Sequence, residues 1–132
     1  MTVHVLLVDD DLSKEILADF LEDMDVNIDF AETGVEACTQ ALKNDYDVIF
    51  MDIVMPDMNG IDATRYLRKN LNVDKQPKIV ASTGNAIITR KGHDQLKAAG
   101  FDDVLIKPYT EDMVQRVFSQ WLPDATCGKQ QS

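Results

Sequence analysis

Short apolar runs alternate along the chain with longer segments in which apolar residues recur every three or four positions. Runs rich in Val, Ile and Leu that end at polar or turn residues predict buried β-strands. The longer segments have the spacing of amphipathic helices. The pattern therefore predicts five strands, each followed by a helix, with the strands at residues 3–8, 26–31, 47–52, 78–82 and 104–106.

The predicted helices are defined by apolar positions that share one face. In the first helix this face comprises Ile16, Leu17, Phe20, Leu21 and Met24. Thr33 is a suitable N-cap for the second helix. In that helix we expect Val35, Cys38 and Leu42 to face inward. Further helices are predicted at residues 61–70, 86–99 and 110–122.

Alternating strands and helices predict right-handed βαβ crossovers, and hence a parallel sheet with helices on both faces. For five strands we predict a flavodoxin-like, doubly wound α/β fold with strand order 2-1-3-4-5 and five helices. Ligands of such sheets bind at the carboxyl edge, beside the first and third strands. The functional site is therefore expected at this edge.

Length and charge narrow the class of protein. The 132 residues predict one domain, which we place at residues 1–123, followed by a flexible tail at 124–132. The formal net charge of −10 repels phosphate backbones and anionic lipid headgroups, which argues against binding to nucleic acid or to a membrane surface.

Neither a membrane protein nor a secreted precursor is expected. The longest unbroken apolar runs, residues 5–8 and 48–51, are far shorter than the roughly 20 residues of a membrane-spanning helix, and residues 1–11 do not resemble a signal peptide. Cys38 and Cys127 form no CxxC motif, so a disulfide framework or zinc site is not expected. We therefore expect a cytoplasmic domain.

Polar residues follow the predicted strands at their carboxyl ends. They are Asp9, Asp10 and Asp11 after the first strand, Asp52 at the end of the third, Ser82 and Thr83 at the fourth, and Lys107 and Pro108 after the fifth. In the predicted strand order Asp9 and Asp10 face Asp52. Crowded carboxylates repel one another unless a cation lies between them, and an all-oxygen, partly hydrated site favours Mg²⁺.

The charges of this edge suit phosphoryl transfer. Asp9, Asp10 and Asp52 contribute −3, which Mg²⁺ and Lys107 balance with +3. The carboxylate of Asp52 could attack phosphorus and become an acyl phosphate. The hydroxyl of Thr83 could then donate a hydrogen bond to a phosphoryl oxygen, which would convert the chemical event into a local movement.

Five sequence motifs, in order and at matching spacing, resemble one family. They are Leu6-Leu7-Val8-Asp9-Asp10, the block from Met51-Asp52 to Asn59-Gly60, Ser82-Thr83, Gly100-Phe101-Asp102-Asp103, and Lys107-Pro108. In these motifs the chain resembles the receiver domain of a two-component response regulator, from about residue 3 to residue 122.

The resemblance implies a phosphorelay function. By resemblance Asp52 accepts a phosphoryl group from a histidine kinase or a histidine phosphotransfer protein, and the domain then signals to a downstream protein. Thr83 and Lys107 would bind the phosphoryl oxygens. Such a domain is not an enzyme beyond its own phosphorylation and dephosphorylation. It is expected to be a monomer or a weak, phosphorylation-dependent dimer, with the fourth strand, fifth strand and fifth helix as one candidate interface.

The resemblance also implies a magnesium site. Asp10 would ligate Mg²⁺ directly, Asp9 through water, and Asp52 and the backbone carbonyl of Val54 would complete the protein ligands. The bond that precedes Pro108 is commonly cis in the family.

Two departures from the family pattern concern signal transmission. Val104 stands where the family usually has an aromatic residue that moves inward together with the threonine. The segment from Thr83 to Lys107 is also about two residues longer than is usual. Phosphorylation is therefore expected to be intact while the readout differs.

Val54 and Asn85 are expected to set how long the phosphoryl group persists. By resemblance they lie two residues beyond the phosphorylated aspartate and the threonine, beside the path of the attacking water. An apolar Val54 should slow that water, which predicts a comparatively long-lived acyl phosphate.

Two alternative hypotheses remain open at this point. A degenerate receiver would bind proteins without being phosphorylated, as the missing aromatic residue at Val104 would allow. A haloacid-dehalogenase-like phosphatase would take its nucleophile from the first strand, where residues 8–13 approximate its motif. That enzyme needs a further acidic pair at a strand end after the lysine, and none is predicted after Lys107.

Overall fold

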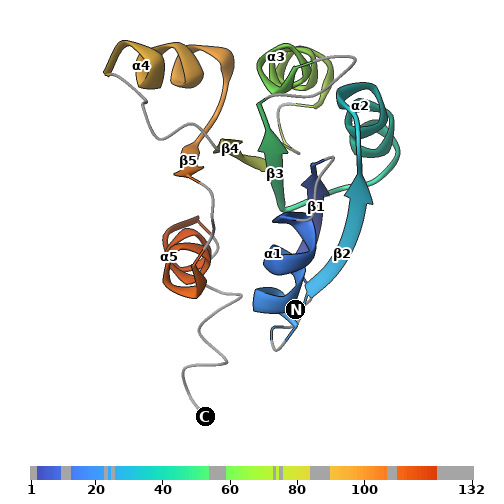
Figure 1. The fold of residues 1–132 in the computed structure, drawn as a ribbon. Coiled ribbons are helices and arrows are strands. Elements are labelled where there is room, and N and C mark those ends of the chain that lie inside the picture. The colour runs from blue at the N-terminus through green and yellow to red at the C-terminus, as the bar shows by residue number, and fades with distance from the viewer. Residues whose placement is uncertain are drawn as a thin grey trace.

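The computed structural model describes residues 3–9, 13–22, 24, 26–53, 59–72, 74, 76–83, 90–106 and 110–121 (Figure 1). Within these residues strands and helices alternate, as predicted. In chain order they are β1 (Val3–Val8), α1 (Ser13–Leu21), β2 (Val26–Ala31), α2 (Gly34–Lys43), β3 (Val48–Asp52), α3 (Gly60–Asn70), β4 (Lys78–Thr83), α4 (Arg90–Ala99), β5 (Asp103–Ile106) and α5 (Glu111–Trp121).

The five strands form one parallel sheet in the order β2-β1-β3-β4-β5, so the predicted topology is confirmed. Figure 1 shows α1 and α5 on one face of the sheet and α2, α3 and α4 on the other. The central strand β3 is buried along its whole length, because it has a neighbour on each side and helices on both faces. The position of Asp52, at the carboxyl end of β3, is therefore fixed by the most buried strand of the sheet.

Each face of the sheet has its own hydrophobic core. Successive side chains of a strand point to opposite faces, so Leu6 joins the core under α2, α3 and α4, and Leu7 joins the core under α1 and α5. In the second core the rings of Phe50 and Phe118 stack with their centroids 6.3 Å apart. This contact ties β3 to α5.

The helix ends explain several element boundaries. The predicted cap is confirmed, because Thr33 Oγ1 accepts a hydrogen bond of 3.0 Å from the backbone N–H of Glu36. The helix α3 begins at Gly60, one residue before the predicted start, because Asn59 Oδ1 accepts from the N–H of Asp62 at 2.8 Å. Gly100 ends α4 with a positive φ of 118°, a conformation that favours glycine.

The predicted inward face of α2 is wrong at two of its three positions. Val35 and Leu42 are 52% and 48% exposed. The buried side consists instead of small residues: Gly34, Ala37, Cys38 and Ala41. These small side chains let α2 lie close to the sheet and to α3, where Cys38 Sγ approaches the carbonyl oxygen of Ala63 at 3.8 Å. Close packing, rather than the size of the apolar side chains, therefore decides which side of α2 is buried.

Smaller differences occur at the periphery. Ile16 and Phe30 are 45% and 44% exposed, because Ile16 lies at the margin of the apolar face of α1 and Phe30 lies on the edge strand β2. The strands β3, β4 and β5 differ from their predicted ranges by one residue at one end. Residues 86–89, the start of the predicted fourth helix, and the predicted tail at 124–132 lie outside the described residues.

Candidate functional site

Two buried carboxylates meet at the carboxyl edge of the sheet. Asp9 directly follows β1 and is 3% exposed, and Asp52 ends β3 and is 6% exposed. The parallel register pairs Val8 with Met51, which places Asp9 and Asp52 side by side on neighbouring strands. The N–H of Asp9 donates to the carbonyl oxygen of Ala31 at 3.0 Å and so extends the sheet to this residue. The predicted juxtaposition of Asp9 and Asp52 is therefore present.

The neighbouring strand β4 contributes hydroxyl groups to the same edge. Ser82 is paired with Asp52, and the N–H of Ile53 donates to the carbonyl oxygen of Ser82 at 3.1 Å. Thr83 is the next residue and is 6% exposed. It is paired with Ile106 on β5, which immediately precedes Lys107 in the sequence. The strand register thus orders Asp9, Asp52 and Thr83 along one edge.

Gly60 supports this edge from behind, a role that sequence analysis missed. Its N–H donates to the carbonyl oxygen of Ile53 at 2.9 Å, at the start of α3. A Cβ atom at this position would overlap the carbonyl oxygen of Asp52 and come within 3.0 Å of Ile53 Cα. The Asn-Gly pair is visible in the sequence as a turn signal, but the close approach depends on where α3 meets β3. Glycine therefore lets the helix begin directly against the backbone of Asp52.

The donor atoms at this edge suit a hard cation. The carboxylates of Asp9 and Asp52 offer only oxygen, and both are buried beside each other with the same charge when ionised. The described residues contain no group of three or more His, Cys, Asp and Glu side chains arranged for a metal. Asp10 and Val54, the other predicted ligands, lie outside those residues. The described part thus presents two carboxylates of the expected type.

The structure does not describe the remaining predicted site residues. They are Asp10, Val54, Asn85, Lys107 and Pro108, so their predicted roles, including the cis bond before Pro108, lie outside the described residues.

In the described part of the chain, none of the helices has the length and hydropathy that a membrane span requires.

Val104 is anchored by a cluster between β5 and α5. It is paired with Ala81 on β4 and is partly buried. The preceding residue, Asp103, accepts hydrogen bonds of 3.0 Å from both Trp121 Nε1 and Arg116 Nη1. Burial raises the pKa of Asp103, but these two donors and the Val104 N–H outweigh it, so the net pKa lies below its usual value. The strand that carries the atypical position is therefore fixed to α5 by a charged network.

A second polar cluster, also missed from the sequence, lies at the amino edge of the sheet, the edge opposite to the carboxylates. Arg68 of α3 donates to Asp102 Oδ2 at 2.7 Å and to the carbonyl oxygen of Gly100 at 2.8 Å. Asp102 Oδ2 also accepts from the N–H of Ile79 at 2.9 Å. The motif that contains Asp102 was recognised, but nothing in the sequence pairs it with Arg68. This second cluster joins α3, β4 and the end of α4.

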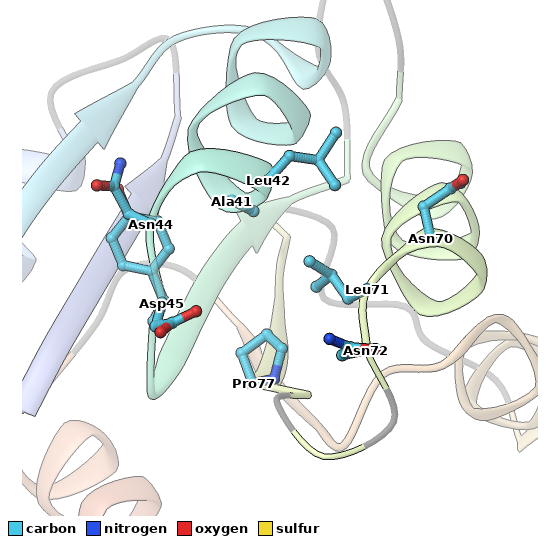
Figure 2. A pocket seen from close by; sticks show the side chains of 9 residues that line it. Ala41, Leu42, Asn44, Asp45, Asn70, Leu71, Asn72 and Pro77 are labelled. Carbon is cyan, nitrogen blue, oxygen red and sulfur yellow. The ribbon is translucent and has the colours of Figure 1, made fainter.

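Near this second cluster lies a cavity of about 340 Å³, at the carboxyl ends of α2 and α3 (Figure 2). Its lining includes Leu42, Asn44, Asp45, Asn70 and Pro77. Because Pro77 directly precedes β4, the cavity opens at the amino edge of the sheet, away from Asp52. It is therefore separate from the paired carboxylates.

Comparison with known proteins identifies relatives of the chain. The sequence model of the response regulator receiver domain matches residues 5–118. The transcription factor SKN7 of Saccharomyces cerevisiae is 34% identical over 126 residues, which cover 92% of this chain and 19% of that protein. The chain spans less than a fifth of the length of three curated relatives that it matches.

Two solved structures with a similar fold are also receiver domains. The receiver domain of the sensor histidine kinase PA1611 from Pseudomonas aeruginosa, with a magnesium ion coordinated in its active site cleft, has a TM-score of 0.80 and 27% identity, covering 93% of this chain and 99% of that one. The receiver domain of Ssk1, crystallised with the histidine phosphotransfer protein Ypd1 of Saccharomyces cerevisiae, has a TM-score of 0.78 and 25% identity, with coverages of 91% and 88%.

Proposed function

The chain belongs to the response regulator receiver domain family, and from this premise we propose that Asp52 is its phosphoacceptor. The observation that carries the proposal is the position of Asp52, a buried carboxylate at the end of the central strand, beside Asp9 and next to the strand that ends in Thr83. The donor would be a phosphohistidine. An oxygen of Asp52 forms a bond to phosphorus while the bond from phosphorus to the histidine nitrogen breaks, and the histidine is released.

Charge compensation is the main requirement of this transfer. The residues that would hold Mg²⁺ are Asp9, Asp10, Asp52 and the carbonyl of Val54, and the metal would offset the negative charge of the carboxylates and the phosphoryl group. Among the chain's own groups, the Thr83 hydroxyl would donate to a phosphoryl oxygen and the Lys107 ammonium would pair with another.

The proposed partners are a histidine kinase or a histidine phosphotransfer protein upstream, and a target protein downstream. The pairing of the Ssk1 receiver domain with Ypd1 supports the first of these, because that receiver has nearly the same fold over 91% of this chain. The net charge of −10 supports a protein target rather than nucleic acid. We place the domain in the cytoplasm, and we propose that it turns over no substrate other than its own phosphoryl group.

Signal transmission is proposed to begin at Thr83 and to proceed without an aromatic switch. Thr83 and Val104 lie on the paired strands β4 and β5. Val104 has no aromatic ring that could move between the surface and the core. The cluster of Asp103, Arg116 and Trp121 holds the same strand to α5. A shift of Thr83 would therefore be carried through the backbone of β5 and this cluster.

The proposal is tested by intact mass after incubation with acetyl phosphate and Mg²⁺. We expect the wild-type chain to gain one phosphoryl group only when Mg²⁺ is present, and Asp52→Asn to gain none. Asp94→Asn is the matched control, because Asp94 is an exposed residue of α4, and it should be modified like the wild type.

Two outcomes would contradict the assignment. If folded wild-type protein gains no adduct, the hypothesis of a degenerate, protein-binding receiver replaces it. If Asp52→Asn is still modified, the phosphoacceptor is another residue. The phosphatase hypothesis is not supported, because residues 5–118 match the receiver family and the buried Asp52 ends the third strand.

A further inference from the structure

The cavity at the carboxyl ends of α2 and α3 takes no part in the proposed phosphorylation. It lies at the amino edge of the sheet, whereas Asp52 lies at the carboxyl edge. Ligand sites in proteins have volumes of roughly 300–1,000 Å³. The cavity holds about 340 Å³, so its size fits one small molecule or one side chain of a partner.

The walls of the cavity combine one carboxylate with apolar side chains. Figure 2 shows the carboxylate of Asp45 on one side, with an oxygen directed toward Leu71 and Pro77 on the other. Leu42 adds a second aliphatic side chain. Of the described residues that line the cavity, none is Lys, Arg or His. The described lining therefore carries one negative charge and no positive charge.

The ends of two helices add to this negative potential. Both α2 and α3 lead from one parallel strand to the next, so both run toward the amino edge of the sheet. They end beside the cavity, at Lys43 and Asn70. The carboxyl end of a helix is equivalent to about half a negative charge. The cavity therefore favours a cation over an anion or a neutral group.

The basic residues in the last turns of these helices do not line the cavity. Lys43 and Lys69 are exposed, and the Cα–Cβ bonds of a helix tilt toward its amino end, away from the cavity. Arg68 donates instead to Asp102 Oδ2 at 2.7 Å and to the carbonyl oxygen of Gly100 at 2.8 Å. The structure thus places none of these three basic side chains in the cavity.

The kind of cation follows from the rest of the lining. The hydroxyl of Tyr46 donates to Asp29 Oδ2 at 2.6 Å, outside the lining, so Tyr46 lines the cavity with its ring. An aromatic ring and aliphatic side chains beside a carboxylate suit a charged head on an apolar stem. A guanidinium suits them better than an ammonium, because it is planar and more weakly hydrated. A metal ion suits them poorly, because Mg²⁺ and Ca²⁺ take about six or more oxygen ligands.

We propose that this cavity binds the side chain of an arginine, which either a free arginine derivative or a protein partner supplies. The guanidinium would pair with the carboxylate of Asp45. The aliphatic stem would lie against Leu42, Leu71 and Pro77. The net charge of −10 supports this choice, because it attracts basic molecules to the chain.

The experiment is a titration of the isotope-labelled chain with N-acetyl-arginine amide, followed by the backbone amide chemical shifts in nuclear magnetic resonance. A salt concentration of about 0.15 M screens unspecific attraction. We expect shifts confined to residues 41–46 and 70–72, and a dissociation constant of about 1–10 mM. N-acetyl-citrulline amide has nearly the same shape without the charge, and at matched ionic strength it should bind about fivefold more weakly.

A charge-matched pair of variants makes the test specific. Asp45 is exposed, so Asp45→Asn should fold normally and should weaken binding of the capped arginine about threefold or more. Asp94→Asn is the control, because Asp94 is exposed on α4 and its replacement changes the net charge by the same amount. It should bind like the wild type. Both variants are first checked for wild-type circular dichroism and melting.

Two further probes distinguish the sources of the guanidinium. A cavity for a free small molecule should bind arginine itself more tightly than the capped tripeptide Gly-Arg-Gly. A cavity for a protein side chain should bind the tripeptide at least as tightly as arginine. Either order supports a guanidinium site and identifies what supplies the group.

The proposal is overturned if capped arginine causes no local shifts at roughly 50 mM, well above the expected dissociation constant. It is also overturned if capped citrulline binds equally well, or if Asp45→Asn binds no more weakly than Asp94→Asn does. The experiment uses neither phosphodonor nor Mg²⁺, and Asp52→Asn should bind like the wild type. Its outcome is therefore independent of the proposed phosphorylation.

Discussion

At the scale of single residues, the predictable part of the site is the part that the sheet edge determines. Asp9, Asp52 and Thr83 could be predicted because each stands at the end of a recognisable strand, and parallel strands bring such ends together. Gly60 could not, because its importance depends on a contact with the carbonyl oxygen of Asp52 that no periodicity encodes.

We predict that Gly60→Ala destabilises the fold and slows phosphorylation. The new methyl group overlaps the carbonyl oxygen of Asp52, so the backbone of this proposed phosphoacceptor must move, at a cost of about 1–3 kcal/mol. Urea unfolding and the rate of adduct formation measure the two effects. Gly92→Ala, inside α4, is the control and should leave the rate unchanged. A Gly60→Ala chain as stable and as reactive as the wild type would disprove the steric argument.

Val54→Asn is predicted to shorten the life of the acyl phosphate. By resemblance to the family, Val54 flanks the path of the attacking water. An apolar side chain there would not orient the water, whereas an amide would, so the dephosphorylation rate should rise about threefold or more. The measurement is the decay of the phosphorylated mass after the phosphodonor is removed. Equal decay rates of the two proteins would count against this role of Val54.

At the scale of elements, the positions of strands and helices were predictable, but the buried side of α2 was not. Val35 and Leu42 carry the strongest apolar signal of that helix, and both are about half exposed. Ala37 and Ala41 are buried because their size permits close contact with the sheet. Hydrophobicity thus predicts that a helix is amphipathic, while packing distance decides which of two apolar sides is covered.

The network that joins β5 to α5 should stabilise the fold in a pH-dependent way. Burial raises the pKa of Asp103, but the hydrogen bonds from Trp121, Arg116 and the Val104 N–H hold the folded-state pKa below its usual value. Its contribution is therefore present above about pH 4 and is lost as the pH falls through the folded pKa. Asp103→Asn should therefore lower the free energy of unfolding by about 1 kcal/mol at pH 7, a value that allows for the half-exposed Arg116.

Urea unfolding at pH 7 and pH 3 tests this dependence. The difference between wild type and Asp103→Asn should shrink at pH 3. Asp94→Asn, an exposed residue of α4, is the control and should show little difference at either pH. A difference that is equally large at both pH values would show that charge on Asp103 is not the cause.

At the scale of the whole molecule, topology followed from the sequence because five strands alternating with helices leave few arrangements open. Contacts between distant segments, such as Arg68 with Asp102, were beyond prediction because each partner alone is an ordinary charged residue. The net charge of −10 is also a property of the whole chain, and repulsion between like charges lowers the stability of the folded state.

We predict that Mg²⁺ raises the melting temperature. Buried Asp9 and Asp52 repel each other in the folded state, and a cation that binds only this state stabilises it by about 1.4 kcal/mol at ten times its dissociation constant, or roughly 4 °C. Thermal melts with and without Mg²⁺ at matched ionic strength measure the shift, and Asp9→Asn should reduce it. A melting temperature indifferent to Mg²⁺ would argue against the metal site.

The anchoring of Trp121 has a consequence for optical measurements. It is the only tryptophan of the chain. Its indole N–H donates a hydrogen bond to Asp103, and Lys78 Nζ lies 5.2 Å from the centroid of its ring. All tryptophan fluorescence therefore originates at the junction of α5 with the amino ends of β4 and β5. Its emission reports without any label whether α5 stays docked on the sheet, at a point remote from the carboxylate pair.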